Sequence, residues 1–183
     1  MQRRKFLAST VAAMPVVVST PVLAKKAVVR KAFTVKAGES RFGERTPFRG
    51  VNPNDLKVSA KDTDGLFSMF EYVGKEKVGP PLHVHFDQDE TFYVVEGEYL
   101  FQIGNETMTV KAGDTIFGAR NVPHTWIQLS DSGKLVYSLQ PAGKMEEFFA
   151  KFSQIKGRPS DEQIQQIHLE HGMKVLGPPL TLK

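Results

Sequence analysis

Three histidines and one glutamate stand at spacings that suit a metal site. His83 and His85 are separated by one residue in an apolar run, so on a β-strand both imidazoles point to the same face. Glu90 follows after enough residues for a short turn and a returning strand, and His124 comes from a later strand. Imidazole nitrogens combined with a carboxylate suit divalent Fe, Mn, Ni, Cu or Zn better than Ca or Mg, which prefer oxygen. The sequence therefore predicts a site for one divalent transition metal and leaves its identity open.

These residues also resemble the two sequence motifs of the cupin superfamily. The residues that carry the resemblance are the run His83-x-His85-x4-Glu90-x6-Gly97 and, further along, Gly113-Asp114 and Pro123-His124. A His-x-His pair alone is weak, because such a pair on a strand is often a half-exposed polar pair. Both motifs in the right order are specific. The resemblance implies an all-β fold, a single cupin jelly-roll barrel (a double-stranded β-helix) with a C-terminal helical tail.

Four residues depart from the usual motifs, and none of them is a predicted ligand. They are Lys77 for the opening glycine of the first motif, and Ala119, Asn121 and Gln128 for the proline, the glycine and the closing asparagine of the second. We therefore expect the metal ligands to be kept, while the loop before His124 takes a different shape.

The segment at residues 79–85 and the phenylalanine-rich tail resemble small bacterial cupins grouped with quercetin 2,3-dioxygenases. The resemblance implies metal-assisted insertion of O₂ into a small phenolic or enolisable substrate. His83, His85 and His124 would then hold the metal. Glu90 would be the fourth ligand and the catalytic base that accepts the proton of the substrate hydroxyl. A carboxylate close to both metal and substrate is suited to that role.

The motif does not fix the reaction, because this barrel hosts isomerases, decarboxylases, oxygenases and plain binding proteins. One alternative is a non-enzymatic protein that uses the metal as structure or as cargo. Another is a barrel that keeps the four side chains and holds no metal. Sugar or nucleotide-sugar chemistry is disfavoured, because the predicted pocket residues Phe92, Val94 and Trp126 are apolar.

Three further residues are candidates for a substrate pocket. Trp126 and Gln128 follow His124 at a spacing of two, so on a strand they face the same barrel interior. Phe92 lies on the strand that begins near Glu90. Core packing and substrate contact are both open for Trp126, and the Gln128 amide would offer a hydrogen bond to a bound group.

Short β-prone segments bounded by Gly, Pro, Asn or Ser fill the centre of the chain. The predicted strands are residues 27–35, 56–59, 66–73, 81–85, 91–95, 99–103, 108–110, 115–117, 124–129 and 135–139. Gly104-Asn105 between two of them indicates a tight hairpin. Strands at this spacing favour a sandwich or barrel, and a jelly roll protects its sheet edges well. We assign the barrel, with its N-terminal strand and loop, to residues 25–140.

After Pro141 the apolar period changes from two to 3.6, which predicts helices in residues 141–183. Met145, Phe148, Phe149 and Phe152 form an apolar stripe of a first helix. Ser160, followed by Gln163 as a capping box, begins a second helix. We expect this tail to pack on the outside of the barrel as a lid or buttress. A homodimer contact is the alternative.

His168 and His171 share one face of the second predicted helix, because they are three residues apart. Such a pair could clamp a metal. No carboxylate or third imidazole stands beside them, so we interpret both as structural residues on a solvated surface.

Residues 1–24 read as an export signal of the twin-arginine type. Arg3-Arg4-Lys5 precedes an Ala- and Val-rich stretch, and Val22-Leu23-Ala24 suits cleavage before Lys25. The alternative is a membrane anchor, but the apolar stretch is barely long enough and contains two prolines. The expected location is the periplasm, with no stable membrane anchor after cleavage.

The composition excludes several other classes of protein. Residues 1–24 hold three basic and no acidic residues, so cleavage lowers the net charge from +4 to +1. No basic stripe with interleaved aromatics remains, which argues against a nucleic-acid partner. The absence of cysteine excludes disulfides and a thiolate metal site. The expected partner is a small-molecule substrate or ligand.

The export signal gives the first testable prediction. Residues 1–24 fused to a reporter protein should carry the reporter across the inner membrane, and replacement of Arg3 and Arg4 by Lys should abolish this transport. Fractionation of the reporter measures the outcome. Unchanged export after the double substitution would point to the ordinary secretory route.

Overall fold

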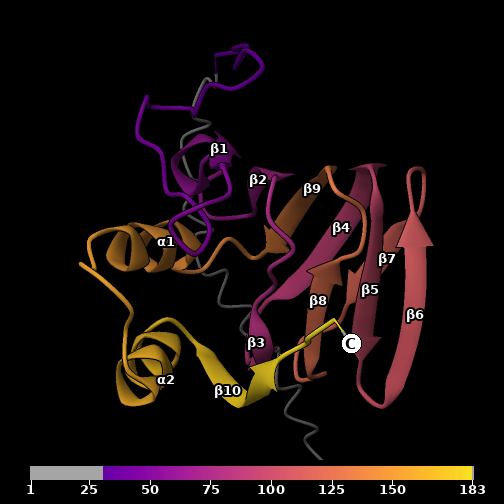
Figure 1. The fold of residues 1–183 in the computed structure, drawn as a ribbon. Helices are drawn as coiled ribbons and strands as arrows, with labels where there is room; N and C mark the ends of the chain where they lie inside the picture. Colours follow the sequence, from indigo (N-terminus) through magenta and orange to yellow (C-terminus); the bar gives the residue numbers. More distant parts are fainter. Residues whose placement is uncertain (1–30, 183) are drawn as a thin grey trace, which may run out of the picture. The chain divides into compact units, whose positions relative to one another are not determined.

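Strands dominate the part of the chain that the structure, a computed structural model, describes: residues 31–182 (Figure 1). The strands there are β1 (Asn54–Val58), β2 (Ser68–Gly74), β3 (Pro81–His85), β4 (Asp89–Glu96), β5 (Glu98–Ile103), β6 (Glu106–Lys111), β7 (Thr115–Gly118), β8 (His124–Gln128), β9 (Gly133–Gln140) and β10 (Met173–Pro179). The helices are the 3-10 helix η1 (Ala60–Asp62) and the α-helices α1 (Met145–Ser153) and α2 (Asp161–Glu170). The predicted signal, residues 1–24, lies outside the described residues.

The strands form two five-stranded antiparallel sheets, which face each other as a jelly-roll barrel. Their orders are β1-β2-β9-β4-β7 and β10-β3-β8-β5-β6. Side chains from both sheets fill the interior, and the aromatic residues that the strands contribute are Phe70, Tyr72, Phe92, Tyr99, Phe101, Trp126 and Tyr137. Burial of this much apolar and aromatic surface is the main term that stabilises the barrel. The predicted fold class is confirmed.

Nine of the ten predicted strands are present, and the described part of the first forms no strand. Residues 31–35 form no strand, and residues 27–30 lie outside the described part. The prediction for residues 31–35 was therefore wrong. β1 is the edge strand of its sheet, and residues 31–35 do not pair with its free side, so their β-branched side chains alone do not make a strand. Residues 36 and 39 instead offer carbonyl oxygens to the Lys57 ammonium.

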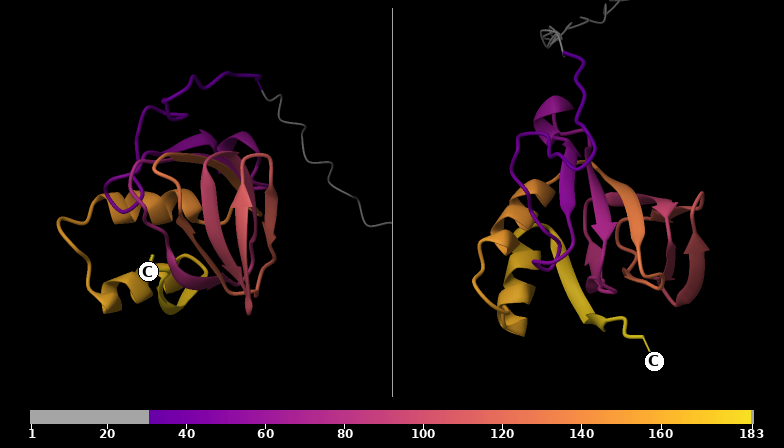
Figure 2. Two further views of the ribbon diagram at one scale, coloured as in Figure 1. Left: turned by 45° about the vertical axis from the view of Figure 1, so that its right-hand side comes forward. Right: turned by 45° about the horizontal axis from the view of Figure 1, so that its top comes forward.

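The tail packs against one side of the barrel and contributes buried side chains to its core. Figures 1 and 2 show α1 and α2 together at one side of the barrel, next to β10. Met145, Phe148 and Phe149 of α1 are part of the buried core cluster. The capping box predicted at Ser160 is present at the start of α2.

β10 was not predicted from the sequence, and it pairs with the histidine strand. Its register places Met173 opposite His85 and Val175 opposite His83. Directly opposed residues of an antiparallel pair point to the same face. Met173, which is 1% exposed, therefore lies beside His85 inside the barrel. The tail therefore supplies an edge strand of the sheet that carries three of the predicted ligands, two of them on the strand next to it.

A carboxylate joins α1 to η1. Glu146 accepts hydrogen bonds from the Ser59 hydroxyl (3.0 Å) and from the Ala60 N–H (2.6 Å). The contact fixes the start of α1 against the loop between β1 and β2. Among the described residues, no helix has the length and apolar character needed to span a membrane.

The position of Phe149 gives a prediction for the tail. Phe149 is 8% exposed and its ring lies 5.0 Å from that of Phe70, so Phe149→Ala should lower the free energy of unfolding by about 3–4 kcal/mol. Phe117→Ala, at a 59% exposed position, should change it by less than about 0.5 kcal/mol. Denaturant unfolding followed by fluorescence of Trp126, the single tryptophan, measures both. Equal stabilities of the two variants would contradict the view that the tail completes the core.

Candidate metal centre

The structure brings together the four side chains that the sequence singled out. β3 directs His83 and His85 inward, and β8 places His124 as the register partner of His83. Glu90 comes from β4 in the facing sheet. One potential ligand atom from each residue lies within 4.8 Å of the others. All four side chains are buried, with exposures between 1% and 7%.

The closest contacts are between atoms that normally bind a cation or share a proton. Glu90 Oε2 lies 3.0 Å from His124 Nε2 and 3.5 Å from His85 Nε2. His83 Nε2 lies 3.2 Å from His85 Nε2. The carboxylate and the three imidazoles therefore converge through one oxygen and three Nε2 atoms.

The other nitrogen of each ring fixes the tautomer. Nδ1 of His83 contacts the Pro81 carbonyl at 2.9 Å, and Nδ1 of His124 contacts the Val122 carbonyl at 3.2 Å. Nδ1 of His85 contacts the side-chain oxygen of Gln88 at 3.3 Å. Each of these oxygens is an acceptor only, so each Nδ1 donates its hydrogen. In the neutral rings, all three Nε2 lone pairs consequently face the cluster.

Three inward lone pairs and one carboxylate repel each other unless a positive charge lies among them. A metal ion that binds through Nε2 and a carboxylate oxygen meets this requirement. A donated Nδ1–H to an oxygen is also the usual outer contact of a histidine ligand. The residues present thus fit one divalent transition metal, and nothing in their chemistry distinguishes among Fe, Mn, Ni, Cu and Zn.

The electrostatics of the metal-free cluster agree with this donor set. Burial and the neighbouring imidazoles of His124 and His85 hold the pKa of His83 well below its usual 6.5, so its ring is neutral at pH 7. Burial alone would raise the pKa of the Glu90 carboxyl, but in the metal-free protein hydrogen bonds from Nε2–H groups of His124 and His85, where a proton takes the place of a bound metal, outweigh burial and leave that pKa far below its usual range. The carboxylate is therefore ionised and available as a ligand.

The loop before His124 accommodates its departures from the motif. Asn121, which replaces the usual glycine, adopts a left-handed backbone with φ of 63°, a conformation that asparagine tolerates better than most residues. Its N–H donates to the His85 carbonyl at 2.8 Å, and the Val122 N–H donates to Ala119 at 3.1 Å. The substitution keeps the turn that presents the Val122 carbonyl to His124.

The expectation of a solvated pair at His168 and His171 was wrong. Both are buried, at 3% and 7% exposure, so all five histidines of the chain are buried. The ring of His168 lies 4.9 Å from that of Phe148 and 6.0 Å from that of His83. His168 borders the cluster without being one of the four grouped residues. The thin apolar stripe of α2 gave no sign of this burial, since it depends on how α2 docks.

The interpretation of both residues as structural agrees with their hydrogen bonds. Nδ1 of His168 donates to the Ile164 carbonyl at 2.6 Å, and Nδ1 of His171 donates to the Ile167 carbonyl at 2.7 Å. These bonds remain within α2 and its C-terminal turn. Burial also lowers the pKa of His168 to about 4.

The three predicted pocket residues lie at different distances from the cluster. Phe92 is adjacent, with its ring 6.3 Å from that of His124. Trp126 packs edge-on against Tyr72 and is a core residue. Gln128 lies at the far end of β8, roughly 13 Å along the strand from His124.

At that far end, the side-chain amide of Gln128 is hydrogen-bonded to the protein itself. It donates to the Ser130 carbonyl at 2.9 Å. The geometry therefore favours Phe92 as a site residue and gives Trp126 and Gln128 packing roles.

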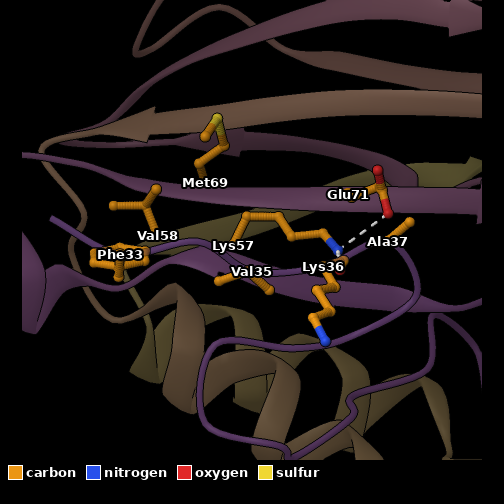
Figure 3. A pocket seen from close by; sticks show the side chains of 8 residues that line it. All are labelled: Phe33, Val35, Lys36, Ala37, Lys57, Val58, Met69 and Glu71. Atoms are coloured by element: carbon orange, nitrogen blue, oxygen red, sulfur yellow. Dashed lines mark hydrogen bonds and ion pairs between the residues drawn. The ribbon is translucent and has the colours of Figure 1, made fainter.

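Two pockets lie elsewhere on the described part of the chain. One of about 410 Å³ lies against β1 and β2, beside the ion pair of Lys57 and Glu71 (Figure 3). Another of about 430 Å³ lies between residues 40–46 and the start of α1. Neither is lined by any of the four clustered residues.

Comparison with known proteins identifies the central part of the barrel. Residues 69–139 match the family model described as Cupin domain. This segment is similar to the cupin domain family. The matched segment includes all four clustered residues, and the two sheets that surround it have the corresponding jelly-roll topology.

Solved structures share the fold at low sequence identity. Pac13, a nucleoside dehydratase from Streptomyces, has a TM-score of 0.53 and 15% identity over 82% of this chain and 95% of that one. KdgF from Halomonas sp. has a TM-score of 0.52 and 10% identity, covering 63% and 98% of the two chains. A predicted oxalate decarboxylase from Thermotoga maritima has a TM-score of 0.51 and 14% identity, covering 60% and 99%.

A curated relative is similar over a short segment. An uncharacterized protein of Methanocaldococcus jannaschii is 42% identical over 43 residues, which are 24% of this chain and 34% of that protein. The match therefore spans about a third of the relative's length. These likenesses establish the cupin fold and leave the reaction of this chain to be argued from its own residues.

The buried histidines give a prediction for pH. The pKa of His168 is about 4 in the folded protein and 6.5 in an unfolded chain. Between these two pH values, the ring therefore stays neutral in the folded state and takes up a proton in the unfolded state. The metal-free protein should therefore lose stability as pH falls from 6.5 to 4, by about 3 kcal/mol from this residue alone. His83 adds a loss of the same sign.

Urea unfolding in EDTA at several pH values measures this loss. The lowered pKa of Glu90 has no influence above about pH 5, because the carboxyl is then ionised in both states. In the His168→Gln variant, the slope of the free energy of unfolding against pH should be smaller, by up to the contribution of one bound proton. A free energy of unfolding that stays constant between pH 7 and pH 5 would contradict the burial of these rings.

Proposed function

We propose that this protein is a metal-dependent cupin enzyme that acts on a small phenolic or enolic substrate with dioxygenase-like chemistry. His83, His85, His124 and Glu90 would hold one divalent transition metal. The observation that carries the proposal is that Nδ1 of all three imidazoles contacts an oxygen, which directs the three Nε2 atoms toward one carboxylate. When bound, the metal would supply Lewis acidity toward a substrate oxygen.

Glu90 has an oxygen available for proton transfer. Its Oε2 contacts the imidazoles of His85 and His124. Its Oε1 makes no hydrogen bond with the residues that the structure describes. A substrate hydroxyl beside Oε1 would lose its proton to that atom, and the resulting negative oxygen would be stabilised by the cationic centre. Glu90 is thus proposed as both ligand and general base.

The surroundings of the cluster favour a flat, apolar substrate. Phe92 lies beside His124, and Phe148 packs on His168, which borders His83. Aromatic rings bind flat conjugated molecules through stacked and edge-on contacts. A sugar would need more hydrogen-bonding side chains than these residues offer. The apolar rings therefore support a phenolic or enolic substrate over a carbohydrate.

Burial favours a second candidate, a non-enzymatic metal-binding protein. None of the four clustered residues is more than 7% exposed. A site closed on all sides would hold a metal as structure or cargo. Exchange of a ligand at the centre separates the two candidates, because an enzyme requires an open coordination position.

We also propose that the protein acts in the periplasm after cleavage of residues 1–24. A twin-arginine route exports folded proteins, so the chain would acquire its intended metal in the cytoplasm before export. The proposed partner is a small molecule, and the net charge of +1 that remains after cleavage gives no basis for binding nucleic acid.

Separate substitutions of ligand and base test the enzymatic proposal. Glu90→Gln keeps the side chain's shape and an oxygen that can coordinate, but it removes the negative charge and the basicity. The variant should retain a good share of the metal and turn over a flavonol or similar enol about 10²-fold more slowly or worse. His83→Ala removes an imidazole ligand and should lose most of the metal.

Metal content and turnover are measured on the same preparations. Fully metallated wild-type protein that turns over none of a panel of phenolic and enolic substrates would end the dioxygenase proposal. That result would favour the metal-binding alternative.

A further inference from the structure

One buried amide connects the metal cluster to the tail. Of the three oxygens that accept from the clustered imidazoles, two are backbone carbonyls and the third is the side chain of Gln88. Gln88 is 4% exposed and lies in the turn between β3 and β4. It is therefore the one acceptor of the three that a substitution can remove.

The orientation of the Gln88 amide is fixed from its other end. Its Nε2 donates to the carbonyl of Ala142 at 2.7 Å and to that of Pro141 at 3.1 Å. A carbonyl oxygen only accepts, so the nitrogen must face the tail and Oε1 must face His85. The network thus allows a single orientation of the amide, and this orientation requires the hydrogen on Nδ1 of His85.

The chain packs closely around this amide. Gly143 adopts a left-handed backbone with φ of 55°, and a Cβ atom added to it would lie 2.6 Å from Gln88 Nε2. Ala142 is 1% exposed, and α1 begins at Met145. The segment that leads into α1 therefore holds Gln88 in place, and Gln88 in turn holds His85.

We propose that Gln88 is a positioning residue that sets the tautomer and orientation of His85 and couples metal binding to the docking of residues 141–145. The inference rests on the metal site proposed above. Without an acceptor at Nδ1, the His85 ring is free to carry its hydrogen on Nε2, where the lone pair for the metal is needed. Donation to an oxygen also makes the ring a more basic ligand.

Coupling follows from the shared amide. If docking of residues 141–145 stabilises the metal-binding orientation of His85, a bound metal must stabilise that docking by the same free energy. Loss of the metal should then loosen the start of α1 even though no residue of α1 is a ligand.

Two substitutions at Gln88 separate its two ends. Gln88→Met has a similar length and makes neither hydrogen bond. It should weaken Co²⁺ binding, followed by the visible absorption of the bound ion, by about 10–100-fold. Gln88→Glu keeps an acceptor for His85 but cannot donate to the tail. It should bind Co²⁺ within a few-fold of wild type and still show faster amide hydrogen exchange in residues 141–149.

A matched pair of glycine substitutions acts on the amide from outside. Gly143→Ala pushes a methyl group against Gln88 Nε2 and should weaken Co²⁺ binding several-fold. Gly157→Ala is the control. Gly157 also has a left-handed backbone, with φ of 82°, but a Cβ atom added there meets no atom within 4 Å. This variant should have the Co²⁺ affinity of wild type, so any backbone strain common to both variants is controlled.

The outcomes distinguish this inference from the function on which it rests. Wild-type affinity in both Gln88→Met and Gly143→Ala would overturn the positioning role and leave the metal site intact. Equal hydrogen exchange of residues 141–149 with and without Co²⁺ would overturn the coupling. A wild-type protein that binds no Co²⁺ would overturn the metal site and this inference together. If Gln88→Met does not fold, Gly143→Ala and Gln88→Glu decide the question.

Discussion

The electrostatic demand of four buried acceptor atoms determines the arrangement of this protein. Three Nε2 atoms and one carboxylate oxygen face each other in an interior from which water is nearly excluded. Such an arrangement is costly unless a positive charge is shared among the groups. Two strands of one sheet, β3 and β8, and one strand of the other, β4, hold this geometry. In each ring, Nδ1 is held by a hydrogen bond to an oxygen outside the cluster. A cation at the centre is the simplest way to satisfy all of these groups.

The tail is best understood as part of the same arrangement. β10 places Met173 and Val175 beside the two histidines of β3, and α1 contributes phenylalanines to the core. α2 brings His168 against His83. Residues far apart in the sequence therefore exclude water from the cluster together. The exclusion of water strengthens every electrostatic interaction inside the cluster. Metal affinity and tail docking are consequently expected to vary together.

Local patterns predicted much of this structure, and pairing between distant segments limited the rest. The His-x-His spacing and the later His124 predicted a cluster because strand alternation alone sets which face these side chains take. Ser160 and Gln163 predicted the start of α2 for an equally local reason. β10 was not predicted, and its last three residues, Gly177, Pro178 and Pro179, are untypical of a strand, although proline is tolerated on an edge strand. Burial of His168 and the double contact of Gln88 arise only when the tail docks, and no spacing in the sequence encodes that contact.

We infer that a transition metal occupies the space between His83, His85, His124 and Glu90. Anomalous scattering from crystals of protein purified from its native compartment tests it most directly. We predict one peak, at about 2.0–2.2 Å from the three Nε2 atoms and from a Glu90 oxygen, with an absorption edge that identifies the metal. A well-ordered barrel that shows no anomalous peak among these four side chains, and instead hydrogen bonds that join them directly through protons, would contradict the account.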